Sequence, residues 1–129
     1  MKWGQHGMNI HDNEIINYQV NLKDKTILLH TISETNEAAT IRFNDLLAYY
    51  FENQLPGSIL IDIFDAGIEL FIPQNRDNLK SRKDHLWPIN YESEEELFSY
   101  LQYNQYHYYV IQSSYGMNGW VVSKEMKVC

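Results

Sequence analysis

Apolar and polar residues alternate along the first third of the chain, which is the pattern of strands that bury one face. Over 16–22, the even-numbered positions are apolar and the odd-numbered positions are Asn or Gln. After a polar turn at 23–25, a second strand is expected over 26–32, and it would pair with the first as an antiparallel hairpin. A third alternating stretch covers 39–44. These segments predict half-buried strands of an antiparallel sheet.

Residues 45–52 fit two structures. The apolar positions 46, 47, 50 and 51 have helical spacing, whereas 47, 49 and 51 fit a strand that continues past a bend. The aromatic residues among them favour the strand. The Pro56-Gly57 pair then predicts a turn. Residues 58–64 form the most apolar strand, so we expect it at the centre of the sheet.

Helical spacing appears in the second half of the chain. Between 68 and 86 the apolar residues recur at intervals that fit one face of a helix. Pro73 must lie in the first turn of this helix or break it, because proline has no amide hydrogen to donate. A second helix is expected over 93–102, since Ser93 and Glu96 have the spacing of a capping box.

Two further strands complete the expected fold, one over 106–112 and one over 120–128, with a turn at 116–119 between them. The order of four strands, two helices and two strands predicts an α+β fold rather than repeated βαβ units. We expect a mostly antiparallel, twisted sheet with both helices against one face. The length of 129 residues fits a single domain over 1–129, in which 1–9 form an extension.

Acidic residues outnumber basic ones, with seventeen Asp and Glu against ten Lys and Arg, which gives a net charge of −7. This balance argues against a nucleic acid partner, because proteins that bind nucleic acids concentrate positive charge. Purely apolar runs such as 59–61 are far shorter than the ~20 residues that span a bilayer. The first residues lack a signal-peptide pattern, and the lone Cys129 cannot form an internal disulfide. We therefore expect a cytoplasmic protein without a membrane partner.

The residues that carry chemistry form no recognisable catalytic or metal-binding motif. The five histidines lack the spacing of clustered metal ligands, and neither His-Glu-x-x-His nor Cys-x-x-Cys occurs. The segment 113–116 is typical of a turn and not of a nucleophile elbow. We therefore expect no catalytic residue, no metal and no cofactor.

Two groups of side chains are candidates for binding a protein partner. Six of the ten tyrosines lie between 100 and 115. Two of them share one strand face, which would present aromatic rings if the opposite face packs on the core. A cluster of acids at the start of the second helix would suit a basic partner. The candidate residues are Glu92, Glu94, Glu95, Glu96, Tyr106 and Tyr108.

Other interpretations of the same residues remain open. Trp87, Tyr91 and Tyr115, together with Tyr108, would line an apolar pocket between sheet and helices in a small-molecule-binding or enzymatic domain. A plain homodimer is a third alternative. Tyrosine is also a good strand former, and acids gather at helix starts because they complement the helix dipole.

The stretch 39–63 contains Thr-Ile-Arg-Phe-Asn-Asp, then Tyr-Tyr-Phe-Glu-Asn, then Ser-Ile-Leu-Ile-Asp-Ile. This succession resembles small bacterial proteins that are similar to immunity proteins encoded beside polymorphic or contact-dependent toxins. The resemblance covers about a fifth of the chain and carries no catalytic motif from which a functional residue could be transferred. It implies a non-enzymatic domain that neutralises a toxin by occluding its active site, with a basic toxin domain as the partner.

Overall fold

The computed structural model describes residues 10–129, which form eight strands and three α-helices. The extension expected over 1–9 lies outside the described residues. The elements are β1 (Glu14–Asn21), β2 (Thr26–Ile32), β3 (Ala38–Asn44), β4 (Ala48–Glu52), β5 (Ile59–Asp65), α1 (Phe71–Gln74), α2 (Arg76–Arg82), α3 (Glu94–Tyr103), β6 (His107–Tyr115), β7 (Asn118–Ser123) and β8 (Glu125–Val128). Short 3-10 turns at Ile68–Leu70 and Lys83–His85 flank α1 and α2.

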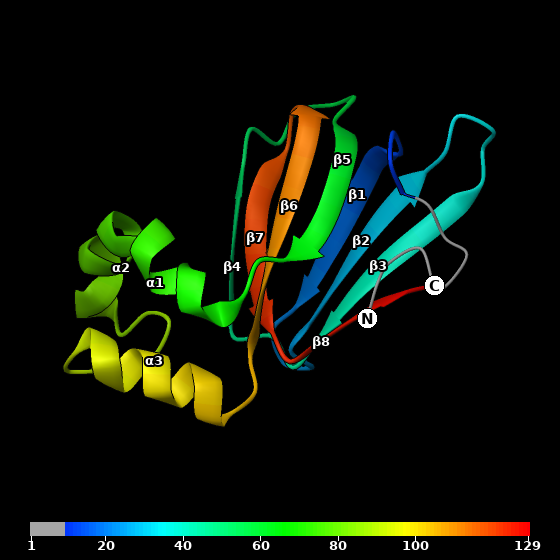
Figure 1. The fold of residues 1–129 in the computed structure, drawn as a ribbon. Helices are drawn as coiled ribbons and strands as arrows, with labels where there is room; N and C mark the ends of the chain where they lie inside the picture. The colour runs from blue at the N-terminus through cyan, green and yellow to red at the C-terminus, as the bar shows by residue number, and fades with distance from the viewer. Residues whose placement is uncertain (1–9) are drawn as a thin grey trace.

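All eight strands belong to one antiparallel sheet, in the order β4-β7-β6-β5-β1-β2-β3-β8. Only residues 45–47 separate β3 from β4, and only Lys124 separates β7 from β8. Each of these pairs is therefore one long strand with a bend. The two bent strands pair with each other twice, β4 with β7 and β3 with β8. The two ends of the sheet are thus joined through the bends, and the sheet curls over on itself (Figure 1).

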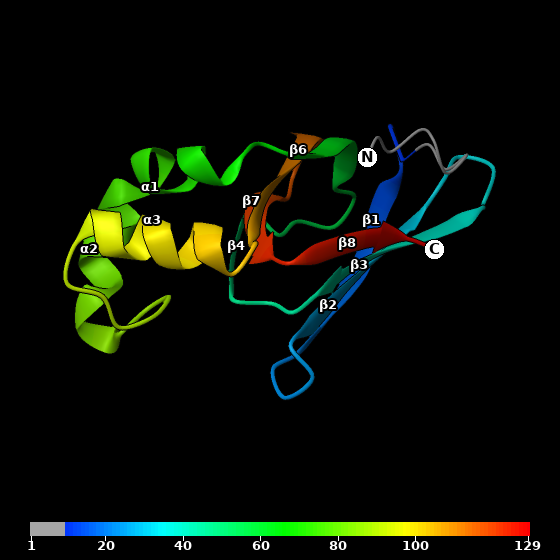
Figure 2. The same cartoon turned by 60° about the horizontal axis from the view of Figure 1, so that its bottom comes forward.

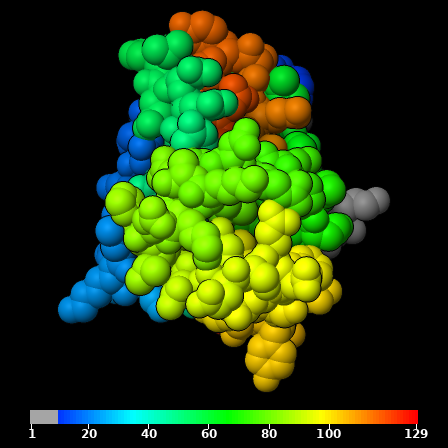
Figure 3. All heavy atoms as spheres, turned by 90° about the vertical axis from the view of Figure 1, so that its left-hand side faces the viewer, coloured from blue at the N-terminus to red at the C-terminus, as the bar shows by residue number. Residues whose placement is uncertain are grey.

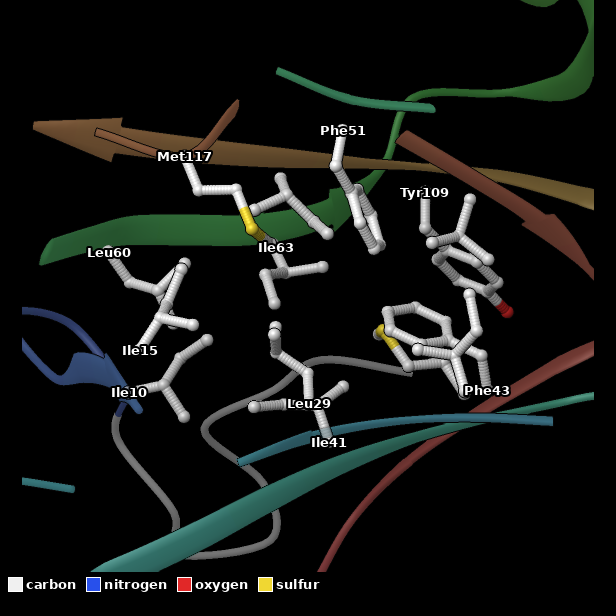
Figure 4. Close-up of a cluster of buried hydrophobic side chains, with 14 of the residues drawn as sticks. Ile10, Ile15, Leu29, Ile41, Phe43, Phe51, Leu60, Ile63, Tyr109 and Met117 are labelled. Atoms are coloured by element: carbon white, nitrogen blue, oxygen red, sulfur yellow. The ribbon is translucent and has the colours of Figure 1, made fainter. Parts of the chain in front are cut away.

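The curled sheet encloses an inner hydrophobic core. Side chains of β2 and β3, such as Leu29, Ile41 and Phe43, meet side chains of the opposite strands, such as Ile63 and Tyr109 (Figure 4). Leu29, Ile41, Phe43 and Ile63 have no exposed surface. The alternation along the first strands has its cause here, because every second residue of β2 and β3 points into this core.

The helices cover the outer face of β4, β7 and β6 and enclose an outer core there (Figures 1 and 2). Successive residues of β7 show how both cores share one sheet: Trp120 and Val122 belong to the outer core, whereas Val121 belongs to the inner core. Leu97 and Leu101 of α3 are fully buried against the outer face. The outer face of β1, β2 and β3 lies on the side of the molecule away from these helices (Figure 2).

Several expectations about the fold are confirmed. The fold is α+β with an antiparallel sheet, and the ambiguous segment 45–52 contains a strand, β4. The apolar strand β5 lies in the interior of the sheet order, as expected. The expected layout of four strands, two helices and two strands is matched only roughly, because the two bent strands are each divided in two.

The expected helix over 68–86 is broken into several turns. Pro73 lies in α1, where it offers no amide hydrogen, and Asn75 has a non-helical φ of −124°. The Asn75 Nδ2 donates to the carbonyl oxygen of Phe71 at 2.9 Å, so α2 begins anew at Arg76. The strand expected over 120–128 is likewise interrupted at Lys124, whose amide donates to the carbonyl oxygen of Asn44 at the bend.

Candidate functional site

The acids predicted to meet a partner lie together at the start of α3, and all of them are exposed. The Ser93 Oγ accepts a hydrogen bond from the amide of Glu96 at 3.1 Å. The Glu96 carboxylate accepts one in return from the amide of Glu92 at 3.0 Å, one residue before the cap. The helix start predicted from Ser93 and Glu96 is confirmed, and the side chain of Glu96 serves the helix itself.

Glu94 is held by the neighbouring helix α2. Arg76 donates to both carboxylate oxygens of Glu94, from Nε at 2.7 Å and from Nη2 at 2.9 Å. The hydrogen bond from Arg76 lowers the pKa of Glu94 against a smaller effect of desolvation, and the charges of Arg76 and Lys80 lower it further. Figure 3 looks onto the layer of helices, in which α2 and the start of α3 form one continuous surface. The acidic helix start is therefore flanked by basic side chains. Glu94 pairs with Arg76 and Glu96 caps the helix, which leaves the side chains of Glu92 and Glu95 for a partner.

The expectation that Tyr108 meets a partner is wrong, because this side chain lies in the outer core and is 3% exposed. Its ring packs on Phe71. Its hydroxyl donates to the Gln74 Oε1 at 3.0 Å and accepts from the Asn75 Nδ2 at 3.1 Å. Tyr109, on the opposite face of β6, lies in the inner core. Both faces of this strand are covered, so neither presents a row of aromatic rings.

Tyr106 lies just before β6 and is only partly exposed. Its ring stacks on Tyr100 with 6.1 Å between ring centroids, and the Lys124 Nζ lies 5.3 Å from the ring centroid. Burial is the main cause that raises the pKa of Tyr106. A role for its remaining exposed edge in partner binding stays a prediction.

The structure places Trp87, Tyr91 and Tyr108 of the alternative pocket in the outer core, and it places Tyr115 elsewhere. The Trp87 ring is covered by the guanidinium of Arg82 at 5.0 Å. Tyr91 is 6% exposed and lies beneath the Lys83 Nζ, 4.0 Å from its ring centroid. Tyr115 ends β6, about 23 Å along the strand from Tyr108 at ~3.3 Å per residue. Trp87 and Tyr91 are therefore part of the helical layer's own packing, and Tyr115 belongs to another surface.

An acidic hollow of about 480 Å³ lies where β1 begins. Asp12, Glu14 and Glu34 line it, together with Ile32 and Ile59. The sheet register explains the grouping, because Glu14 lies opposite Ile32 on β2 and opposite Ile59 on β5. Within 10–129, neither Glu14 nor Glu34 forms an ion pair. Their charges therefore remain available at the surface.

An apolar groove of about 420 Å³ lies next to this hollow, between β1 and the segment 53–58. Its apolar lining consists of Ile15, Ile16, Tyr18, Leu55, Pro56 and Met117. Ile16 is 53% exposed and Leu55 is 48% exposed. Grouped apolar side chains that remain exposed commonly mark interaction sites.

The wall of the apolar groove is fixed by Ser58, which is 2% exposed. Its Oγ donates to the carbonyl oxygen of Leu55 at 2.6 Å and accepts from the amide of Met117 at 2.9 Å. Gly116 has a φ of +84°, and a Cβ at this position would lie 2.1 Å from the Ser58 Oγ. The segment 53–58 is thereby attached to the turn between β6 and β7, and the groove is formed before any partner binds.

Neither the hollow nor the groove has a lysine or arginine in its lining. The sequence contains no Lys or Arg between Arg42 and Arg76, or between Lys83 and Lys124. This surface is not visible in the sequence, since its acids come from segments that are about twenty residues apart. Of the apolar groove residues, only Leu55, Pro56 and Met117 lie in the two stretches without Lys or Arg, and none of the hollow's acids does, so no local sequence signal marks the acidic hollow.

No group of three or more His, Cys, Asp or Glu side chains within 10–129 could hold a metal ion. No helix in that range has both the length and the apolar character that crossing a membrane requires. In comparisons with known proteins, no protein-family model and no curated protein matches this chain.

Proposed function

We propose that this chain is a protein-binding domain of the immunity type, which neutralises a bacterial toxin by covering its active site. The observation that carries this proposal is the apolar groove beside the acidic hollow, at an end of the molecule whose lining contains no basic residue. Protein interfaces combine an apolar centre with a polar rim. An acidic rim attracts a basic surface and speeds association with it.

A nuclease toxin is the kind of partner that fits this charge. The cleft of a nuclease must attract phosphate and therefore carries positive charge. An acidic domain bound over such a cleft would exclude the substrate by volume and by charge. The exposed Glu92 and Glu95 at the start of α3 offer a second acidic surface with the same preference.

Co-expression with the product of the adjacent gene tests the proposal. If that gene encodes a toxin domain, the present chain should restore growth and should co-purify with the toxin as a complex. Loss of both effects would contradict the proposed function.

Paired charge variants identify which acidic surface is used. Glu14→Gln combined with Glu34→Gln removes two charges from the hollow, and Glu92→Gln combined with Glu95→Gln removes two from α3. We expect the first pair to slow association with the toxin and to weaken its salt dependence, while thermal unfolding is unchanged. The second pair is the matched control, and an effect confined to it would move the interface to the helix.

A further inference from the structure

We propose that the partner is held through an extended segment that lies along the open edge of β1, with an apolar side chain in the groove and flanking Lys or Arg side chains toward the acidic hollow. This inference rests on the proposed function and adds the way in which the partner is recognised. Three features support it: the unpaired edge of β1, the preformed apolar groove, and the acidic hollow without Lys or Arg in its lining.

The unpaired edge results from the way β1 meets its neighbours. β1 pairs with β2 from Glu14 to Asn21, but it pairs with β5 only around Glu14. Ile16 is skipped in the pairing with β2, which marks a β-bulge. Within the described chain, residues 17–21 therefore have a strand neighbour on one side only. An extended peptide can add to such an edge through main-chain hydrogen bonds.

The apolar groove lies beside this edge and gives the added segment a preference for one side chain. Ile16 and Leu55 stand on its two sides, and both keep about half of their surface exposed. The contacts of Ser58 fix the groove in the unbound chain. Binding to a preformed groove costs less conformational entropy than binding to a loop that must first become ordered.

Charge selects the partner and argues against a second copy of this chain. A basic side chain on the added segment, a few residues from the apolar one, would reach the carboxylates of Asp12, Glu14 and Glu34 in the adjacent hollow. Two copies joined along β1 would instead bring together two chains that each carry a net charge of −7, and like charges repel. The occupant is therefore a basic segment of another protein.

Three labelled nine-residue peptides test the proposal directly. The first has a central Leu with Lys on both sides, the second has Glu in place of Lys, and the third has Gly in place of Leu. We expect the first peptide to shift the backbone amide resonances of 16–21, Leu55, Gly57 and Ser58 of the ¹⁵N-labelled chain. By fluorescence anisotropy, the other two should bind at least about tenfold more weakly. Equal binding of the Glu peptide, or resonance shifts confined to other surfaces, would overturn the proposal.

Variants of the groove provide the second arm of the test. Leu55→Asp should abolish binding of the Leu-Lys peptide, and Leu86→Asp is the matched control, because Leu86 is 58% exposed on the helical layer. Circular dichroism checks that each variant folds. If Leu55→Asp does not fold, the resonance shifts of the unaltered chain decide whether the peptide binds in the groove. If Leu55→Asp still binds the toxin with unchanged affinity, the groove proposal fails while the proposed function stands.

Discussion

Buried tyrosine hydroxyls set the response of this protein to alkaline pH. Burial raises the pKa of Tyr109 to about 12, and the nearby negative charges of Asp65 and Glu125 act in the same direction. Burial is also the main cause that raises the pKa of Tyr108 on the opposite face of β6. The fold therefore favours the neutral phenol over the phenolate at both positions.

We expect the free energy of unfolding to fall as the pH rises from 10 to 12. The unfolded chain releases the Tyr109 proton near the ordinary pKa of 10, whereas the folded chain keeps it until about pH 12. The stabilisation is fully present below pH 10 and is lost as the pH approaches the folded-state pKa. Urea unfolding at several pH values measures this loss, and Tyr109→Phe should show a smaller one. An identical pH dependence in both proteins would contradict the assignment to Tyr109.

At the scale of the element, alternation predicted β1, β2 and β3 within two residues of their observed bounds. In β2 and β3 the apolar face is buried, whereas in β1 Tyr18 and Val20 are only half-buried and Ile16 is exposed. The same rule could not reveal the bends at 45–47 and Lys124, since a bent strand keeps its alternation on both sides. It predicted β6 as a strand but not the burial of its two faces, because the first half of β6 lies between the two cores and has no polar face.

Gly57 and Gly116 have similar φ angles but different surroundings, so substituting each by Ala compares backbone strain alone with strain plus a steric clash. Gly57 has a φ of +80° and open space around an added Cβ, whereas Gly116 has a φ of +84° and the Ser58 Oγ 2.1 Å from such an atom. Gly57→Ala should destabilise the fold by about 1 kcal/mol through backbone strain. Gly116→Ala should cost clearly more, since Ser58 must also move. Chemical denaturation measures both, and equal losses would show that the turn relaxes around the new methyl group.

The N-cap of α3 gives a second comparison within one element. Ser93→Ala removes the acceptor for the amide of Glu96 and should destabilise the fold by about 1 kcal/mol. Ser99→Ala, at an exposed position inside the same helix, should be neutral or slightly stabilising because Ala is the better helix former. Thermal unfolding of the two variants compares them, and equal effects would argue against the cap.

At the scale of the whole molecule, the inner and outer cores are coupled because they share the strands β4, β6 and β7. Leu29 lies in the inner core and Leu101 in the outer core, and both have no exposed surface. Each Leu→Ala change should lower the free energy of unfolding by about 2–5 kcal/mol. Far-ultraviolet circular dichroism and aromatic fluorescence should follow one common transition in both variants. Separate transitions in Leu101→Ala would show that the helical layer unfolds by itself.

The candidate surface was less accessible to prediction than the fold. The acids at the start of α3 were visible because they are consecutive, yet Glu94 and Glu96 turn out to have local roles. Asp12, Glu14 and Glu34 become neighbours only through strand pairing. The groove depends on the position of Leu55 beside Ile16, which no local pattern encodes. Tertiary contacts of this kind require the curl of the sheet to be known.

The edges of the curled sheet also bear on how the chain behaves at high concentration. The strands at the two ends of the sheet order, β4 and β8, have only five and four residues, so they offer little template for the growth of aggregates. The unpaired length of β1 is of similar size, and the net charge of −7 opposes the approach of another copy. An extended partner segment that pairs with β1 as proposed would cover this edge. The complex would then be more soluble than the chain by itself.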